Sequence, residues 1–454
     1  MTRDADVLFA HSRDASGIEL VPEGVARASS VDDVVEVVRF AAGTGTAVTP
    51  AGSQTSMTAA SITDHGLILS LAAMTRIADV DVERRVARVE PGVRIGDLNR
   101  TLAEHGLMFA PDPTSEEDAT IGGAIACNAS GARSLHYGPT RNHVNALSIV
   151  HADGEVACYS RFRPEKNAVG YAAAQDPVDW FVGSEGTLGI VVEAELSLVR
   201  IPFTPIGLAI PFRTETAALD FVVAARSRES RRSPRCLEFF DAGALAIAAD
   251  SAGLPWTESA LALVYLEDDA GRDGDVDEVL AAWLRVAEAN DALSGDIRVY
   301  EGAQALREAR VMRHAVPATM NERGARFRHQ GGRKISTDWA VHYRRLGEAL
   351  AVSREAIERH GAPSPVTYGH AGNGHPHQNF IAEDGEALNR IQAAIEETLV
   401  CVVRMGGTVS AEHGLGKLKR RWLGLQLGAR QIELMRAMKN VLDPSGMFSP
   451  GNVL

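Results

Sequence analysis

The stretch Gly183-Ser184-Glu185-Gly186-Thr187-Leu188-Gly189 carries the strongest indication of how this chain folds and what it holds. Glycine has no side chain, so backbone amides in such a stretch can approach an anion closely, and serine and threonine hydroxyls add further donors. A strand is predicted directly after it, over residues 189–199. A glycine cluster by itself most often marks a turn, so its meaning depends on the rest of the chain.

Two more glycine-rich patches precede this stretch. They are the loop Pro50-Ala51-Gly52-Ser53-Gln54-Thr55-Ser56 and the segment Thr120-Ile121-Gly122-Gly123, which is followed by Asn128-Ala129-Ser130-Gly131; Pro111-Asp112-Pro113-Thr114 lies between them. The three patches together predict a cradle for the diphosphate of a bound cofactor, without any lysine. The chain has no G-x-x-x-x-G-K-[ST] motif and no strand-linked G-x-G-x-x-G motif, which argues against a P-loop nucleotidase and a Rossmann NAD site.

Length and composition indicate a globular protein. The chain has 454 residues, of which 45% are apolar and 23% are charged, and this length suggests about two to three domains. The net charge of −13 argues against nucleic acid as a partner. The four scattered cysteines form no C-x-x-C pair, which argues against a cysteine metal centre and a disulfide framework and favours a cytoplasmic protein. The acidic start is no signal peptide, and no run of about eighteen apolar residues predicts a membrane helix.

The spacing of apolar residues predicts an α+β fold. Ser30 followed by Asp33 predicts the start of a helix whose buried face carries Val34, Val38 and Ala41, and a glycine at 43 or 45 should end it. Strands are expected at residues 47–49, 67–71, 86–90 and 147–152, and a helix at 95–105. The stretch 201–205 predicts a boundary, giving a first domain over 1–203 and a second over 204–454 whose last residues return to the first. In the second domain, helices at 277–288, 303–316, 343–359, 386–405 and 429–441 alternate with strands at 261–266 and 365–369, which is typical of an antiparallel sheet covered by helices.

The order of these segments resembles the FAD-binding domain of the vanillyl-alcohol oxidase / p-cresol methylhydroxylase superfamily, and within it the D-lactate dehydrogenase, glycolate oxidase GlcD-type and D-2-hydroxyglutarate dehydrogenase branch. The matching segments are residues 89–93, 111–113, 120–123, 137–141 (Tyr137-Gly138-Pro139-Thr140-Arg141) and 183–189. The resemblance spans nearly the whole chain and implies a two-subdomain PCMH-type FAD-binding domain followed by an α+β cap domain with an antiparallel sheet. The branch's first loop commonly reads P-R-G-G-G-T-S. Here Ser53 and Gln54 replace two glycines, so we expect a stiffer loop with more side-chain donors.

The resemblance implies a bound FAD, which we expect to be non-covalent, because His65, His136 and His143 are attachment points by residue type only. The residues expected to contact FAD are Pro50, Gly52, Ser53, Gln54, Thr55, Ser56, Pro113, Thr114, Gly122, Gly123, Asn128, Gly131, Tyr137, Gly138, Glu185, Gly186, Gly189, Ile190 and Asn452.

A second site is predicted in the segment Gly369-His370-Ala371-Gly372-Asn373-Gly374-His375-Pro376-His377-Gln378-Asn379. Asn373-Gly374 is a turn signal, so His370 and His377 can face each other across it. Neutral imidazoles suit a divalent metal such as zinc or manganese, and Glu412 in the segment 410–417 is the candidate carboxylate ligand. A single histidine is more often a hydrogen-bonded core or loop residue, and His375 is an alternative ligand at the same turn.

This segment also resembles the branch's motifs G-H-x-G-D-G-N-x-H-x-N and E-H-G-I-G, with Asn373 and His375 in place of the branch's Asp and Asn. The resemblance implies that His370, His377 and Glu412 bind the metal. It further implies that Asn379 contacts the substrate and that His413 is the base beside the flavin.

The resemblance also implies a 2-hydroxy acid substrate, whose carboxylate needs a cation to bind it. The resemblance favours Arg313, and Lys334 and Lys417 are further candidates. Arg307 and Arg310 share the predicted helix with Arg313, and spacing does not separate the three arginines.

These expectations together imply FAD-dependent oxidation of a D-2-hydroxy acid (D-lactate, glycolate or D-2-hydroxyglutarate class) to the 2-keto acid. A second acceptor, such as a quinone, a cytochrome or an electron-transfer flavoprotein, should then reoxidise the flavin. A transferase of the alkyl-glycerone-phosphate synthase type is the first rival function, but it uses a run of consecutive histidines that this chain lacks. A flavin-binding subunit of a multi-subunit oxidase is the second, and a metal hydrolase, which would give the glycine patches no role, is the third. We expect a cytoplasmic protein, peripheral to a membrane at most, and a homodimer is compatible with the sequence.

Overall fold

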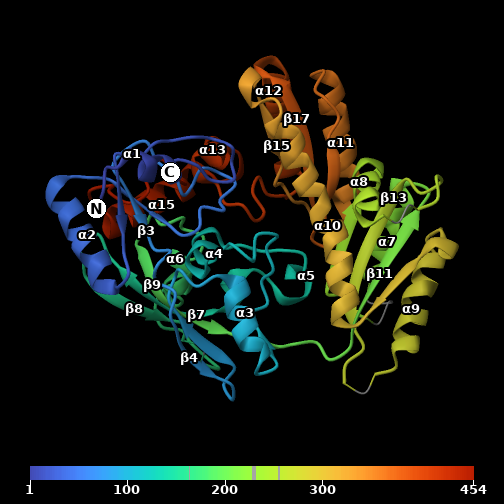
Figure 1. Ribbon diagram of the computed structural model, residues 1–454, viewed down its shortest axis with the longest axis horizontal. Helices are drawn as coiled ribbons and strands as arrows, with labels where there is room; N and C mark the ends of the chain where they lie inside the picture. The colour runs from blue at the N-terminus through green and yellow to red at the C-terminus, as the bar shows by residue number, and fades with distance from the viewer. Residues whose placement is uncertain (163, 228–231, 254–255, 273) are drawn as a thin grey trace. The chain divides into compact units, whose positions relative to one another are not determined.

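The computed structural model describes residues 1–162, 164–227, 232–253, 256–272 and 274–454, which form two compact units (Figure 1). The first unit comprises Met1–Gly131, Gly138–Ile201 and Glu412–Leu454, and the second comprises Ala132–Tyr137 and Pro202–Ala411. The chain thus changes unit close to the expected boundary after residue 203. The short excursion of residues 132–137 into the second unit is not foreseen by the sequence patterns.

The first unit opens with a three-stranded parallel sheet in the order β1 (Gly24–Arg27), β3 (Leu67–Ser70), β2 (Val48–Ala51). Helix α2 (Val31–Thr44) starts with a capping box between Ser30 and Asp33 and ends at Gly45, whose φ of 67° is left-handed. Its buried residues Val34, Val38 and Ala41 share one core cluster with β2 and β3. The predicted helix is therefore confirmed in its start, its buried face and its end.

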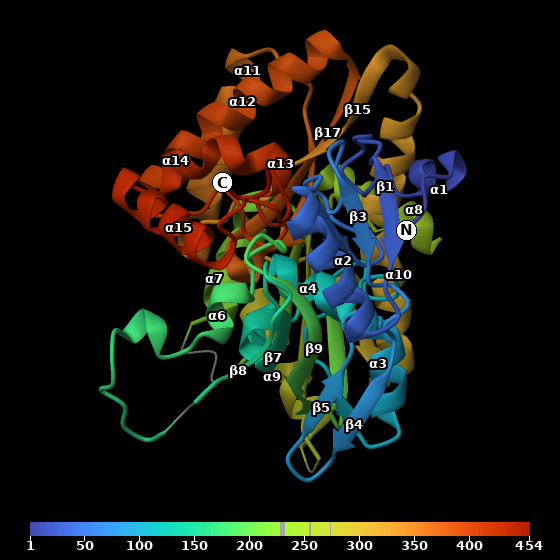
Figure 2. The same cartoon turned by 90° about the vertical axis from the view of Figure 1, so that its left-hand side faces the viewer.

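The same unit holds a five-stranded antiparallel sheet in the order β4 (Ile77–Asp81), β5 (Val86–Val89), β9 (Ile190–Ser197), β7 (Val144–Val150), β8 (Val156–Ser160) (Figure 2). Burial alternates along β9, so one face of the sheet points into a core. Helices α3 (Ile95–Ala103), α4 (Ile121–Cys127) and α6 (Val178–Phe181) contribute Leu98, Ile121 and Phe181 to that core. The core thus fixes α4 beside the strand that follows the Gly183–Gly189 stretch.

Shorter elements complete the first unit. They are α1 (Ala5–Ala10), the strand pair β6 (Leu107–Met108) and β10 (Val199–Arg200), and the helices α13 (Gly416–Lys419), α14 (Leu423–Gln426) and α15 (Ala429–Leu442). After α15 the chain returns to the parallel sheet, where Phe448 pairs with Val48.

The second unit is built on a seven-stranded sheet whose neighbouring strands all pair antiparallel. The strand order is β14 (Arg298–Glu301), β11 (Pro205–Phe212), β13 (Ala262–Asp269), β12 (Cys236–Phe240), β16 (Val366–His370), β17 (His375–Asp384), β15 (Gly331–Ser336). Strand β13 is buried along almost its whole length, so both faces of the sheet are covered. Helices α8 (Ala242–Ala252) and α10 (Gly302–Ala325) cover one face. This confirms the expected antiparallel α+β cap.

The remaining helices of the second unit are α5 (Ser134–Tyr137), α7 (Glu215–Ala225), α9 (Val276–Glu288), α11 (Leu346–Arg359) and α12 (Gly385–Arg404). Among the described residues, no helix of either unit combines the length and the apolar composition that crossing a lipid bilayer requires.

Helix α10 corrects one prediction. The sequence places its end at residue 316, before Pro317, but the helix continues through Pro317 to Ala325. A proline inside a helix removes one backbone hydrogen bond and costs about 3 kcal/mol. Met312, Val316 and Met320 lie in the core beneath the helix on both sides of Pro317, and their burial offsets that cost. Arg313 consequently stands in the middle of a long helix rather than near its end.

Candidate active site

The three glycine-rich patches lie together in the first unit. Gly183 and Glu185 donate backbone hydrogen bonds to the carbonyls of Ile125 and Ala126 in α4, at 2.9 and 2.8 Å. A Cβ atom on Gly52 would lie 2.1 Å from the Oγ1 atom of Thr120. These contacts join the first and third patches to the second, as a shared diphosphate cradle requires.

Gly186 shows why glycine is needed here. Its φ is 69°, and a Cβ atom on it would lie 2.6 Å from the Cγ atom of Pro50. A side chain would therefore be strained and would push the Pro50 loop away. Such close packing around a glycine leaves its backbone amide accessible, which is the feature that lets amides surround a phosphate.

In the loop after Pro50, polar side chains form hydrogen bonds within the loop and to the neighbouring backbone. Gln54 adopts a left-handed φ of 54°, and its amide nitrogen donates to the carbonyls of His11 and Ser61 at 3.0 and 3.3 Å. Ser56 and Thr58 share a hydrogen bond at 3.3 Å. The Gln54 amide thus braces the loop, whereas its expected contact with FAD stays a prediction.

Other predicted FAD contacts lie around the same cradle. Asn452 donates to the carbonyls of Ala60 and Glu185 and accepts a hydrogen bond from Lys417 at 2.8 Å. A Cβ atom on Gly122 would lie 2.7 Å from Pro91, and one on Gly131 would lie 2.3 Å from the carbonyl oxygen of Asp112, beside Pro113 and Thr114. Asn128 ends α4 in a left-handed conformation, Gly123 donates to Thr120, and Gly189 leads into β9 at Ile190.

Tyr137 is the expected FAD contact that lies outside this group. It belongs to the second unit, where the guanidinium of Arg235 lies 5.8 Å from its ring centroid, whereas the adjacent Gly138 belongs to the first unit.

The side chain of Glu185 is bonded to the backbone of the segment that follows His413. Its side chain is 5% exposed and accepts hydrogen bonds from the backbone amides of Leu415 and Gly416 at 2.6 to 3.0 Å. Burial raises the pKa of Glu185, and the two amides act in the opposite direction. Thr58 adds a hydrogen bond to the carbonyl of His413 at 3.3 Å. Glu185 therefore holds the segment that carries His413, and its expected contact with FAD stays a prediction.

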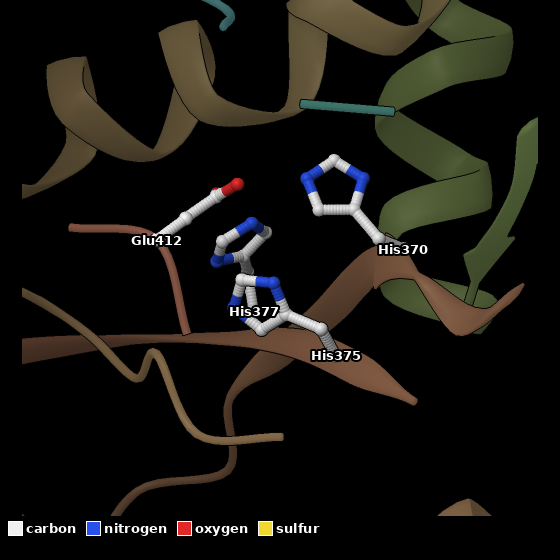
Figure 3. A group of neighbouring side chains, drawn as sticks. All are labelled: His370, His375, His377 and Glu412. Carbon is white, nitrogen blue, oxygen red and sulfur yellow. The ribbon is translucent and has the colours of Figure 1, made fainter. Parts of the chain in front are cut away.

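In the second unit, the hairpin of β16 and β17 collects three buried histidines (Figure 3). Gly374 makes the turn with a φ of 68°, and His370 is paired directly with His375, while His377 pairs with Tyr368. The imidazole centroids of His370, His375 and His377 lie 4.5 to 5.4 Å apart. The three imidazoles therefore lie together. The tight turn places His370 opposite His375, and alternation along β17 puts His377 on the same face as His375.

Neighbouring acceptors fix the orientation of these rings. The Nδ1 atom of His370 lies 2.7 Å from a carboxylate oxygen of Glu238, and that of His377 lies 3.4 Å from the carbonyl oxygen of Thr337. In metal-binding histidines one ring nitrogen is usually held by an acceptor of this kind, so the two contacts fit that arrangement. His375 Nε2 lies 3.1 Å from Asp338, without the alignment of a hydrogen bond.

Glu412 directly follows Ala411, the last residue of the second unit, whose amide is bonded to the carbonyl of Asp338. One ligand atom from each of His370, His375, His377 and Glu412 lies within 4.8 Å of the others (Figure 3). Ser130 donates to the Glu412 carboxylate at 3.0 Å. Imidazoles with one carboxylate form a donor set that fits zinc or manganese.

Arg313 and Glu238 form a buried ion pair beside the histidines. The Nε atom of Arg313 lies 3.1 Å from Glu238, whose other oxygen contacts His370. Burial alone would raise the pKa of Glu238, but His370 and Arg313 hold it at about 2. Glu238 is a residue of the candidate site that the motifs miss. The one available signal is a charged residue inside the apolar strand β12.

Asn379 and Lys334 share the face of the sheet that carries the histidines, because Ser336 is paired with Asn379 and Lys334 with Ile381. Asn379 is fully buried, donates to the carbonyl of His377 and leaves its own side-chain oxygen without a partner. Such an orphaned buried oxygen fits a group that a bound molecule would supply. Burial lowers the pKa of Lys334 to about 8, and its ammonium donates to Asn321 at 2.9 Å.

The remaining candidate cations differ in how far they are buried and in the unit to which they belong. Arg307 is exposed and donates to Gln304, whereas Arg310 is half-buried and Arg313 is buried. Lys417 lies in the first unit, where it donates to Asn452 and to the carbonyl of Ala59, and burial lowers its pKa to about 8.

Comparison with known families gives a clear match for both parts of the chain. Residues 22–158 match the model of an FAD binding domain, and residues 207–453 match the C-terminal domain of FAD linked oxidases. The chain belongs to the FAD-linked oxidase family. The match of the first part with an FAD binding domain agrees with the cradle that the glycine patches form.

Relatives of this FAD-linked oxidase include the glycolate oxidase subunit GlcD of Bacillus subtilis, 31% identical over 95% of this chain and 89% of that protein. D-lactate dehydrogenase of Archaeoglobus fulgidus is also 31% identical, over 95% of this chain and 91% of that protein. D-2-hydroxyglutarate dehydrogenase of Stutzerimonas stutzeri is 28% identical, over 99% of this chain and 95% of that protein. A solved alkyldihydroxyacetonephosphate synthase shares the fold, with a TM-score of 0.69 and 18% identity over 95% of this chain and 78% of that one.

In this FAD-linked oxidase, changing Glu185 to Gln is expected to slow turnover by about 10- to 100-fold while FAD stays bound. The amide side chain keeps the shape but turns an NH₂ group toward one of the two backbone amides, and a lost hydrogen bond to a charged group is worth roughly 1.5–3 kcal/mol. Flavin absorbance and steady-state kinetics measure the two effects. The exposed Glu83→Gln is the matched control. Loss of flavin with a normal rate per bound flavin would show that Glu185 serves the cofactor instead.

Proposed function

We propose that this FAD-linked oxidase oxidises a small D-2-hydroxy acid to its 2-keto acid. The observation that carries the proposal is the buried group of three histidines and Glu412, flanked on one sheet face by Asn379 and Lys334. The relatives named for glycolate, D-lactate and D-2-hydroxyglutarate support the choice of substrate class.

The flavin site and the metal site would contribute different chemistry. When bound, the flavin supplies the two-electron acceptor and the divalent metal supplies a Lewis acid for the substrate's hydroxyl oxygen. The glycine cradle and Asn452 would hold FAD, and His370, His377 and Glu412, with His375 beside them, would hold zinc or manganese. A second acceptor of the quinone, cytochrome or electron-transfer flavoprotein class would take the electrons onward.

The chain's own residues bind the substrate and move its proton. Arg313 and Lys334 would bind the carboxylate, and the buried amide of Asn379 would bind a polar group of the substrate through its unpartnered oxygen. His413 would accept the hydroxyl proton as general base. Glu185 and Thr58 orient the segment on which His413 stands, which limits the motion of the base.

An anaerobic titration tests the proposal. The purified holoprotein, mixed under argon with D-lactate, is expected to lose the visible absorbance of oxidised flavin and to release one pyruvate per flavin. L-lactate is the control for stereochemistry and should reduce the flavin far more slowly. If glycolate, D-lactate and D-2-hydroxyglutarate all leave the flavin oxidised, the proposed function is wrong.

A further inference from the structure

Helix α15 in the first unit exposes apolar side chains to solvent. Leu434, Met438 and Val441 follow one another at helical spacing on one side of the helix, and they are 60, 37 and 78% exposed. Ile432 and Met435 lie on its inner side and are half-buried. The helix is therefore apolar on both sides, whereas a helix at the surface of a globular protein normally turns polar residues outward.

A second group of exposed apolar side chains lies in the same unit, in the chain between β8 and α6. Phe162, Val169 and Tyr171 are 72, 81 and 88% exposed. Among the residues that the structure describes, these three and Val441 are the most exposed of the large apolar side chains. Figure 2 shows this connection projecting on the same side of the first unit as α14 and α15. Lys439 of α15 donates to a backbone carbonyl of the stretch that follows α6, at 2.7 Å.

Positive charge accompanies these apolar side chains. Residues 416–442 carry seven lysines and arginines and one carboxylate, Glu433, in a chain whose net charge is −13. Glu433 pairs with Arg430 at 2.8 Å, and the next carboxylate, Asp443, is buried and paired with Lys439. Residues 161–176 add three cations and two carboxylates. The surface of α14 and α15 is therefore basic, and its exposed cations are Arg420, Arg421, Arg430 and Arg436.

The combination of charge and apolar exposure distinguishes between possible binding partners. Large apolar side chains exposed together usually mark a binding surface. A two-fold dimer would pack this surface against the same surface of a second copy, which would bring the arginines of both copies together. A nucleic acid would match the arginines but not the apolar side chains. A bilayer with anionic headgroups matches both, because apolar side chains enter its boundary while cations contact the headgroups.

We propose that this face, formed by the outer side of α15, by α14 and by the connection between β8 and α6, binds the surface of an anionic lipid bilayer. Phe162 and Tyr171 place aromatic rings at the level of the headgroups, and the exposed arginines contact the headgroup anions. The inference goes beyond the proposed function and does not depend on the substrate. A protein bound in this way would reach acceptors of the quinone class, which dissolve in the bilayer.

Co-sedimentation of the FAD-loaded protein with lipid vesicles tests the inference. Vesicles of phosphatidylglycerol and phosphatidylcholine in equal parts should bind the protein at low salt. Vesicles of phosphatidylcholine alone should bind it at least about tenfold more weakly, because each cation near an anionic surface raises the affinity about fivefold. Salt at about 1 M, where charges are screened within about 3 Å, should also weaken the binding to the mixed vesicles.

Val441→Asp should weaken binding to the mixed vesicles by about tenfold or more, because burial of an apolar side chain is lost and a negative charge meets the headgroups. Val311→Asp is the matched control, since Val311 is 59% exposed on α10 in the second unit, and it should bind like the wild type. Tyr171→Ser, in the other part of the face, should also weaken binding. Flavin content and the temperature of thermal unfolding should be unchanged in all three variants, because each side chain is exposed.

Absence of binding to the mixed vesicles, or equal binding by Val441→Asp and Val311→Asp, would overturn the inference. A dimer that light scattering detects in the wild type and that Val441→Asp abolishes would mean that a second copy covers this face, which would overturn it as well. Neither result concerns reduction of the flavin by a 2-hydroxy acid, so the proposed function would stand in both cases.

Discussion

Changing Glu412 to Ala is expected to release the metal and to slow turnover by about two to three orders of magnitude, because a Lewis acid contributes several kcal/mol of transition-state stabilisation. The yellow flavin should remain, since the glycine cradle in the first unit does not include Glu412. Metal analysis, flavin absorbance and kcat measured on one preparation give the three quantities. The loss should also persist at high substrate concentration, since the missing charge acts on the chemical step.

Glu355→Ala is the matched control, because Glu355 is exposed on α11 and the substitution removes the same side chain. It should retain metal, flavin and turnover. Wild-type turnover in a Glu412→Ala protein that contains no metal would show that the metal has no role in catalysis.

The second large effect is expected at His413. His413→Ala should lower kcat by about 10²- to 10⁴-fold, the range for loss of a general base, while metal and flavin stay bound. Free imidazole added to the variant should restore part of the rate, because it can enter the space of the lost ring and accept the proton. The rate is measured with and without imidazole at a fixed substrate concentration.

His329→Ala serves as the control, because His329 is exposed in the second unit and contacts Gln330. It should show neither the loss nor the rescue. A His413→Ala rate close to that of the wild type would mean that another group accepts the proton.

Much of the local structure can be predicted because it depends on neighbouring residues. The capping box of Ser30 and Asp33 and the stop at Gly45 define α2 from within its own sequence. The end of α10 could not be predicted in this way. Pro317 is a strong local stop signal, and only the packing of Met312 and Met320 in the folded core overrides it.

In the candidate site too, the residues that are close in sequence could be predicted to lie together, whereas those brought together by tertiary pairing could not. The histidines of the hairpin lie within a few residues of one another, so a turn signal and alternation along a strand suffice to bring them together. Glu238 lies far away in sequence and reaches His370 only through the pairing of β12 with β16. Glu185 sits in the most specific glycine motif, and the motif indicates that the backbone is closely packed there but not where the carboxylate points.

We propose that a bound flavin and a metal held by the histidines act on the same substrate molecule. Stopped-flow reduction of the flavin by D-2-hydroxyglutarate under argon tests it directly, on protein stripped of metal with a chelator and on the same protein reloaded with zinc or manganese. Fast loss of the oxidised-flavin absorbance is expected only in the reloaded protein. Equal rates of reduction with and without metal would contradict it.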